Sequence, residues 1–129
     1  MEEKLKMIRA WIEQADQKIV VAQKLLDLDY YDDATSRAYY GMFYAAKAAL
    51  LSVDVDTKSH AGVLNQFSQQ FIKTGQIDKS FGRMLALVMQ ARETSDYSPE
   101  ITVSQSNAEA IMQDAQTFVA QVKAFLSIS

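Results

Sequence analysis

Apolar residues recur at intervals of three and four along most of the chain, which is the period of an amphipathic helix. The first series runs without a break and stops near residues 27–31. Its members are Leu5, Ile8, Ile12, Ala15, Ile19, Ala22 and Leu26. This spacing predicts a long first helix with one buried stripe.

The same spacing returns in four further segments, each bounded by residues that start or stop helices. The expected starts are Asp32 or Asp33, Ser59, Asp78, and Ser104 or Ser106; the expected stops are Ser52, Gly75, and Tyr97 or Ser98 ahead of Pro99. Helices joined by such short connections pack side by side. The sequence therefore predicts an all-α fold, an antiparallel up-and-down bundle of about five helices, forming one domain over residues 1–129.

Two glycines lie inside expected helices, Gly41 in the second and Gly82 in the fourth. Glycine costs a helix interior about 1 kcal/mol relative to alanine, and a close approach between helices would justify that cost. We therefore expect the second and fourth helices to pack at short range, within a subunit or across a dimer.

Composition narrows the function classes. The formal net charge of −3 does not draw the chain onto nucleic acid, so any RNA binding needs a local basic patch. The absence of cysteine excludes disulfides and thiol nucleophiles and favours a cytoplasmic location. The charged N-terminus does not resemble a signal peptide, and no apolar run approaches the ~18 residues that predict a membrane span.

Metal and cofactor sites are not indicated. His60 is the only histidine, and a lone histidine without cysteine argues against zinc. No glutamate has a histidine three residues on, as di-metal bundles require, and no glycine-rich phosphate loop is present. We interpret His60 as a helix-start residue and expect neither a metal nor a cofactor.

A polar and aromatic stripe follows the second helix beside its core stripe. Arg37, Tyr40, Tyr44 and Lys47 are spaced by three, four and three residues and share one face. Two phenols between two cations can hold a phosphate and stack a base. The alternative is a bundle edge at which tyrosines bury their rings and keep their hydroxyls in water. Both interpretations remain open.

The end of the fourth helix reads QARETSDYSPE over residues 90–100. Arg92 and Asp96 stand four residues apart and can form an exposed ion pair worth about 0.3–0.5 kcal/mol. Tyr97 lies about 140° around the helix from Arg92, so the two converge only if the helix unwinds before Pro99. The segment is either a salt-bridged helix end or a polar site.

Three segments together resemble the HEPN ("higher eukaryotes and prokaryotes nucleotide-binding") proteins, small stand-alone domains of bacteria and archaea. They are SRAYYGMFYAAKAALL (36–51), SHAGVLNQFSQQFIKTGQI (59–77) and ARETSDYSPE (91–100). The resemblance covers nearly the whole chain. It implies an antiparallel helical bundle, usually a homodimer. It also implies one of three roles: a metal-independent endoribonuclease, a toxin encoded beside a minimal nucleotidyltransferase, or a non-catalytic RNA- or nucleotide-binding module.

Carried over by position, Arg92 matches the arginine of the family motif and Glu93 its polar neighbour. Tyr97 stands where catalytic members have a histidine, and a tyrosine, with a pKa of about 10, is a poor base at neutral pH. The departure favours an RNA- or nucleotide-binding module in a toxin–antitoxin-like system with a nucleotidyltransferase partner. The residues expected to bind are Arg37, Tyr40, Tyr44, Lys47 and Asp96.

Two alternatives remain. In the first, the protein is an endoribonuclease whose catalytic candidates, Arg92, Tyr97 and Glu93, meet across a dimer interface; Arg92 would stabilise the pentacovalent phosphate and Tyr97 would act on the 2′-hydroxyl. In the second, it is a structural bundle without a site. Tyr97 is also a hypothetical acceptor of a nucleotide transferred by the partner enzyme.

Overall fold

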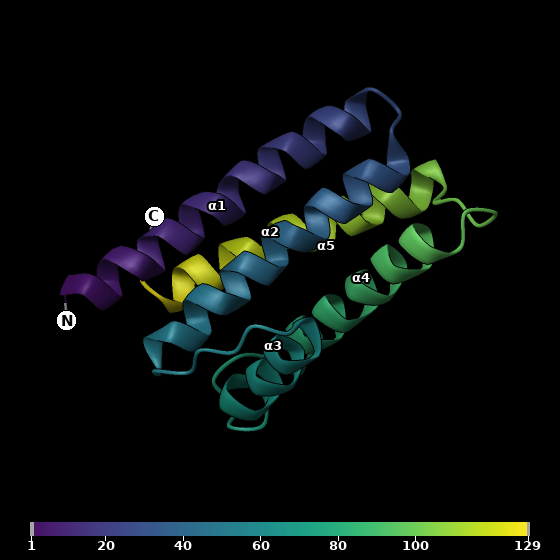
Figure 1. Ribbon diagram of the computed structural model, residues 1–129. Helices are drawn as coiled ribbons and strands as arrows, with labels where there is room; N and C mark the ends of the chain where they lie inside the picture. The colour runs from purple at the N-terminus through teal and green to yellow at the C-terminus, as the bar shows by residue number, and fades with distance from the viewer. Residues whose placement is uncertain (1, 129) are drawn as a thin grey trace.

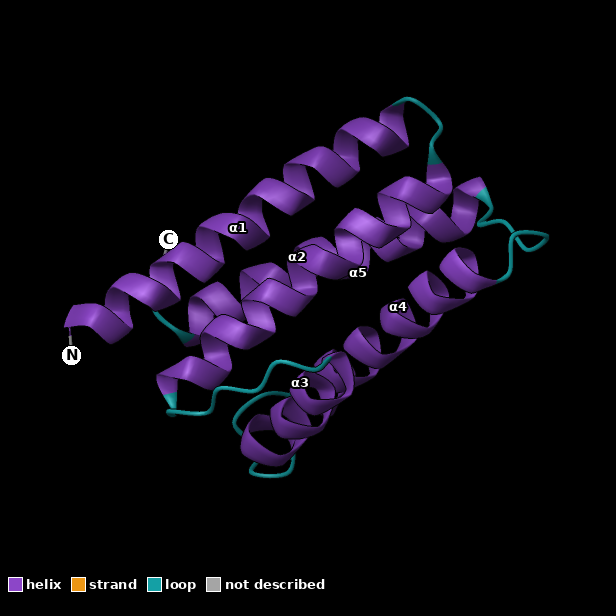
Figure 2. Ribbon diagram, viewed as in Figure 1, coloured by secondary structure: helices purple, strands orange, loops and turns teal. Residues whose placement is uncertain are grey.

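The computed structural model describes residues 2–128, so the two end residues of the expected domain lie outside the described part. This part contains five α-helices, one short π-helix and no strand (Figures 1 and 2), which confirms the predicted all-α bundle. The elements are α1 (Glu2–Asp27), α2 (Tyr31–Ser52), α3 (His60–Phe67), η1 (Ser68–Ile72), α4 (Lys79–Tyr97) and α5 (Gln105–Phe125).

Helix α2 lies at the centre of the bundle and packs against all four other α-helices. Figure 1 shows α1 along one side of α2 and α4 along the other, with α5 behind and the short α3 beside the start of α4. The core contains most of the predicted α1 stripe, including Ile8, Ile12 and Ala15, although Leu5 is exposed. Chain segments from both halves of the sequence therefore meet along α2.

Side-chain caps fix the starts of three helices. The side chains of Ser59, Asp78 and Ser104 each accept a hydrogen bond from a backbone amide in the first turn, at 2.9 to 3.2 Å. This confirms the predicted starts of α3 and α4 and selects Ser104 over Ser106 for α5. Gly75, predicted to follow the third helix, has the left-handed φ of 79° expected of such a glycine.

The expectation that an aspartate caps α2 is wrong. The helix starts at Tyr31, and the residue before it makes no side-chain cap bond. Asp32 instead accepts hydrogen bonds from Ser95 Oγ at 2.6 Å and from the amide of Val103 at 3.1 Å. Asp32 therefore ties the start of α2 to the end of α4 and to the loop that follows it.

The two helical glycines do mark close approaches, but within the subunit neither of them lies between α2 and α4. A Cβ on Gly41 would lie 2.7 Å from Ile19 Cδ1 and 3.3 Å from the carbonyl oxygen of Ala15, both on α1. A Cβ on Gly82 would lie 3.2 Å from Ile72 Cγ1 on η1. Glycine thus brings α2 close to α1 and α4 close to η1, while α2 and α4 meet through larger side chains.

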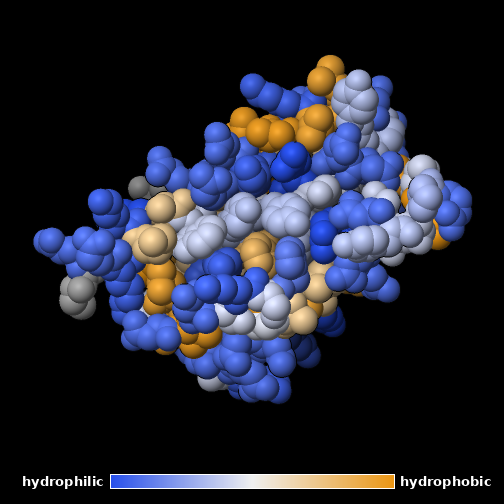
Figure 3. All heavy atoms as spheres, viewed as in Figure 1, coloured by the Kyte–Doolittle hydropathy of each residue, from blue (hydrophilic) through white to orange (hydrophobic). Residues whose placement is uncertain are grey.

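Hydrophilic residues cover most of the face seen in Figure 3, and hydrophobic residues form separate patches on it. Among the helices of the described residues, none combines the length and the hydropathy needed to cross a membrane.

Candidate functional site

The side chain of Arg92, on α4, is buried against the rings of α2. Its exposed fraction is 8%. Its guanidinium carbon lies 4.9 Å from the ring centroid of Tyr39 and 5.8 Å from that of Tyr40. A guanidinium at these distances is attracted by the negative ring faces. The motif arginine is therefore the point at which α4 meets the aromatic residues of α2.

Only part of the hydrogen-bonding capacity of Arg92 is used. One terminal nitrogen donates to Asp96 Oδ2 at 3.2 Å, which confirms the predicted pair, although the arginine in it is buried rather than exposed. The Nε atom is buried and has no acceptor among residues 2–128. An unpaired buried donor costs about 1–3 kcal/mol and is rare in native proteins.

His60 joins the same group of rings from the first turn of α3. Its Nδ1 atom lies 2.6 Å from the hydroxyl oxygen of Tyr39. Its ring stacks on Phe43, with centroids 4.5 Å apart and planes 19° from parallel. The imidazole is thus fixed both by a hydrogen bond and by stacking.

Burial and neighbouring charges favour the neutral imidazole. Burial lowers the pKa of His60, Arg92 lowers it further, and Lys47 adds a smaller effect in the same direction, while Glu93 opposes them. Burial also raises the pKa of Tyr39 far above its usual value, against the opposing effect of Arg92. The phenol therefore keeps its proton, and the imidazole is unprotonated at neutral pH.

The rings continue from α2 towards α1. Tyr40 lies 6.0 Å from Tyr44, and Tyr44 stacks on Trp11 at 5.3 Å with planes 22° from parallel. The ammonium group of Lys47 lies 4.6 Å above the Trp11 ring. We call this group the aromatic cluster: Trp11, Tyr39, Tyr40, Phe43, Tyr44 and His60.

Several predicted site residues come together at this cluster and others do not. Tyr40, Tyr44 and Lys47 belong to it or contact it, and Asp96 pairs with Arg92. Glu93 is half-buried and close enough to affect His60. The two residues that do not join them are Arg37, which is exposed, and Tyr97.

Tyr97 points away from the site. It is 78% exposed, and α4 stays helical as far as this residue. The unwinding that would turn Tyr97 towards Arg92 is therefore not observed. The residues that sequence reasoning missed are Tyr39, for which no site role was predicted, and His60, which was assigned only to a helix start.

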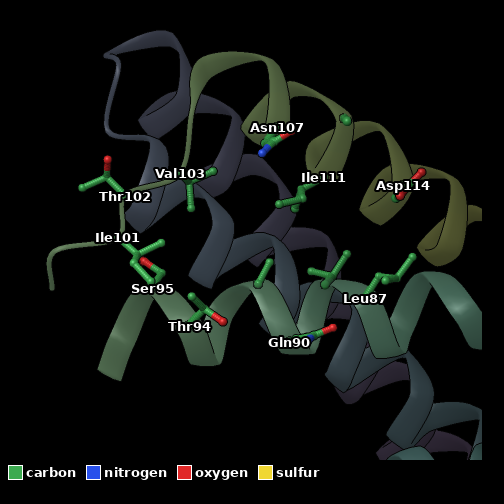
Figure 4. Close-up of a pocket in the computed structure, with 13 residues that line it drawn as sticks. Leu87, Gln90, Thr94, Ser95, Ile101, Thr102, Val103, Asn107, Ile111 and Asp114 are labelled. Carbon is green, nitrogen blue, oxygen red and sulfur yellow. The ribbon is translucent and has the colours of Figure 1, made fainter. Parts of the chain in front are cut away.

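A second surface feature lies on the other side of α4. A groove of about 470 Å³ runs between α4 and α5 and is closed at one end by the loop after α4 (Figure 4). Its apolar lining includes Leu87 and Ile101, which are 62% and 52% exposed. Within residues 2–128, no three acidic, histidine or cysteine side chains gather to form a metal site.

The fold and the site define a small all-helical domain with a buried arginine and a neutral imidazole packed on the same tyrosines. The sequence model of the HEPN domain matches residues 8–125. The chain belongs to the HEPN domain family.

The chain is similar to two proteins of Methanocaldococcus jannaschii named "Putative toxin MJ0142" and "Putative toxin MJ0605". It is 34% identical to the first over 89% of this chain and 78% of the relative, and 35% identical to the second over 90% and 86%. A "UPF0332 protein" of Thermotoga maritima is 31% identical over 92% of this chain and 90% of the relative.

A crystal structure of TT1696 from Thermus thermophilus has the same fold. The TM-score is 0.77, and the match covers 92% of this chain and 97% of that chain. At 19% identity, this likeness concerns the fold alone.

Proposed function

We propose that this protein is an RNA- or nucleotide-binding HEPN module in which Arg92 holds a phosphate and the aromatic cluster stacks a base. The observation that carries the proposal is the buried guanidinium, which packs on Tyr39 and Tyr40 and has an Nε without an acceptor. Arginine is suited to phosphate because its planar donors match phosphate oxygens.

The surroundings of Arg92 support a nucleotide rather than a simple anion. Tyr40 and Tyr44 are only half-buried, and Tyr44 already stacks on Trp11, so a base would meet the exposed parts of these two residues. Stacking on such rings contributes about 1–3 kcal/mol per base and tolerates many sequences. Lys47 supplies a second cation on the same surface. With an overall charge of −3, this local arrangement has to supply the attraction for RNA.

The names of the Methanocaldococcus relatives support a toxin-type role. We propose that the protein works in a toxin–antitoxin-like system with a nucleotidyltransferase partner. The hydroxyl of Tyr97, on a side chain that is 78% exposed, is accessible for modification by such a partner.

We also propose a homodimer, and the apolar groove between α4 and α5 supports a contact there. Replacing Leu87 by glutamate places a charge in this groove and should convert the dimer to a monomer. Leu28→Glu is the matched control, because Leu28, in the turn after α1, is 66% exposed and does not line the groove. Size-exclusion chromatography with light scattering measures the mass. A monomeric wild type, or a dimer that survives Leu87→Glu, would refute this interface.

A second candidate function is metal-independent RNA cleavage. It is favoured by one observation, the neutral imidazole of His60, which packs on the same rings as Arg92.

The proposal is tested by the binding of fluorescently labelled single-stranded RNA, followed by anisotropy in EDTA. Arg92→Ala should weaken binding about 10- to 150-fold, because a hydrogen bond to a charged group contributes about 1.5–3 kcal/mol. Arg83→Ala is the matched control: it removes the same charge from an exposed position on the same helix. Equal losses in the two variants would mean that only bulk charge matters, and the Arg92 site would be rejected.

A further inference from the structure

We infer that a groove between α3–η1 and α4 is the docking site for an acidic, amphipathic helix of a partner protein. The groove has a volume of about 720 Å³ and lies on a different side of α4 from the groove of the proposed dimer contact. Neither Arg92 nor any residue of the aromatic cluster lines it. The inference therefore goes beyond the proposed function and does not depend on it.

The groove has two helical walls. One wall is α3 with η1, which contributes Leu64, Ser68 and Ile72, and the other is the first half of α4. Figure 1 shows α3 beside the start of α4. The π-helix η1 is closed by the amide of Lys73, which donates to the carbonyl oxygen of Ser68 at 2.9 Å. Such turns are rare and are frequent at functional sites, so the wall that carries Ser68 and Ile72 has a geometry typical of recognition surfaces.

Small residues on α4 keep the groove open. Gly82 and Ala86 both line it and stand four residues apart, so no side chain larger than a methyl group projects from α4 at these two positions. Three larger apolar side chains around them, Leu64, Ile72 and Met89, are half-buried. Methionine adapts its shape to different apolar partners. A docked helix can therefore approach the backbone of α4 closely and place its apolar side chains against these three residues.

Two cations border this apolar surface. Lys79 and Arg83 line the groove, are exposed and stand four residues apart on α4. Within residues 2–128, neither forms an ion pair and no acidic side chain lines the groove. Asp78 is close enough for both cations to lower its pKa, but hydrogen bonding to Ser80, where it caps α4, lowers that pKa more. We call this surface the basic groove.

The charge of the basic groove favours an acidic partner. An apolar groove bordered by cations is complementary to a helix that has aspartate or glutamate beside its apolar residues. The groove between α4 and α5 has the opposite character, because Asp114 and no lysine or arginine of residues 2–128 lines it. The two sides of α4 are therefore suited to different partners.

Two other occupants fit the basic groove less well. In a two-fold contact between copies of this chain, the groove would bring Lys79 and Arg83 of both copies into one interface, where like charges repel. Single-stranded RNA stacks its bases on open rings. The one ring that lines the groove belongs to Phe67, which is 1% exposed. A helix with an apolar side and acidic borders is the occupant that uses both the apolar walls and the cations.

The experiment starts from a displayed library of helix-forming peptides of about 16 residues, which span about 24 Å as helices. Peptides are selected on the immobilised full chain. The enriched sequences should carry an excess of aspartate and glutamate, with apolar residues spaced by three and four. The strongest binder is then synthesised with a fluorescent label, and its affinity for each variant is measured by anisotropy.

The first variant tests the apolar floor of the groove. Ala86→Glu should weaken peptide binding about 10²-fold, because it places a like charge against the acidic peptide. Ala86 is exposed in the free protein, so the fold should tolerate the change, which circular dichroism checks. Gln90→Glu is the matched control: it adds the same charge at an exposed position one turn further along α4, outside the basic groove.

The second variant tests the charge of the border. Lys79→Glu combined with Arg83→Glu should weaken peptide binding about 10-fold, because two attractive pairs are replaced by two repulsive ones. Lys6→Glu combined with Arg9→Glu is the matched control, which changes the net charge equally at two exposed positions of α1. Added salt should weaken the binding of the peptide to the wild type.

Losses in the two groove variants that their controls do not share would support the inference. A library that yields no binder, enriched peptides without an acidic excess, or equal affinities of Ala86→Glu and Gln90→Glu would overturn it. Two further results would also overturn it: a lower mass of the free protein in Ala86→Glu, which indicates self-association, and displacement of the peptide by single-stranded RNA. None of these results depends on Arg92→Ala, so the proposed function stands or fails separately.

Discussion

Helix α2 has two faces that differ in side-chain size and chemistry. One face meets α1 through Gly41, and by helical spacing Ala45 and Ala48 share that face. All three are buried. The other side carries Tyr39 and Phe43, which pack against His60 and, in the case of Tyr39, against Arg92. One helix thus contributes both a tight apolar contact and a polar, aromatic one.

The contrast explains how a small bundle can hold a buried cation. Small residues let α1 and α2 approach closely, and close-packed contacts resist rearrangement. The opposite side of α2 can then carry large rings and a guanidinium without losing the shape of the site. A site on rigid helices is held more accurately than one on loops. Stability and recognition should therefore respond to different substitutions.

The largest effect on stability is expected at the small face. Gly41→Leu should lower the free energy of unfolding by about 2–3 kcal/mol, because the new side chain meets Ile19 and the backbone oxygen of Ala15. Urea denaturation followed by circular dichroism measures the change. Gly82→Ala is the control: its Cβ meets only side-chain atoms of Ile72, the nearest at 3.2 Å, so a change within about 1 kcal/mol is expected. Equal losses would show that the two contacts are equally tight.

A smaller effect is expected where the aromatic side is tied to the end of α4. Asp32→Ala removes the acceptor of Ser95 Oγ and of the Val103 amide and should cost about 1–2 kcal/mol. Asp33→Ala controls for the charge near the helix start, because Asp33 is exposed on the same first turn. The difference between the urea midpoints of Asp32→Ala and Asp33→Ala measures the contribution of the two hydrogen bonds that Asp32 accepts. If both variants have the same urea midpoint, these hydrogen bonds contribute no measurable stability.

The smallest effect is the pH dependence set by His60. Its pKa is lower in the folded state than in the unfolded chain, so the unfolded chain binds more protons as pH falls below about 6.5. The stabilisation is complete above that pH and is lost as pH falls towards the folded-state pKa. The carboxylates titrate equally in the wild type and in His60→Asn. The difference between the pH dependences of their stabilities therefore measures the contribution of the histidine. Between pH 7.5 and pH 5.5, the free energy of unfolding should fall more in the wild type than in His60→Asn. Equal falls in the two proteins would contradict the lowered pKa of His60.

The helices were predictable because their signals are local. The three–four spacing of apolar residues gives the elements, and Ser59 and Asp78 give two of the starts. The predicted role of Asp32 was wrong because a carboxylate at a helix start usually caps its own helix. Here its hydrogen-bond partners lie 63 and 71 residues away in the sequence. A glycine inside a helix indicated a close contact at Gly41, but the sequence does not indicate which helix makes that contact.

The site was only partly predictable. Arg92 and Tyr40 were indicated by motif and spacing, and the structure brings them together. The bond between Tyr39 and His60 joins residues 21 positions apart and depends on the path of the chain between α2 and α3. The one sequence signal for it is that the only histidine directly follows a strong helix cap.

The stacking of Trp11 on Tyr44 under Lys47 gives the protein an optical probe of its own. Trp11 is the one tryptophan in the chain, so all indole fluorescence comes from the edge of the aromatic cluster. A base that stacks there changes the surroundings of this single emitter. The intensity and wavelength of its emission therefore follow occupancy of the cluster in unlabelled protein.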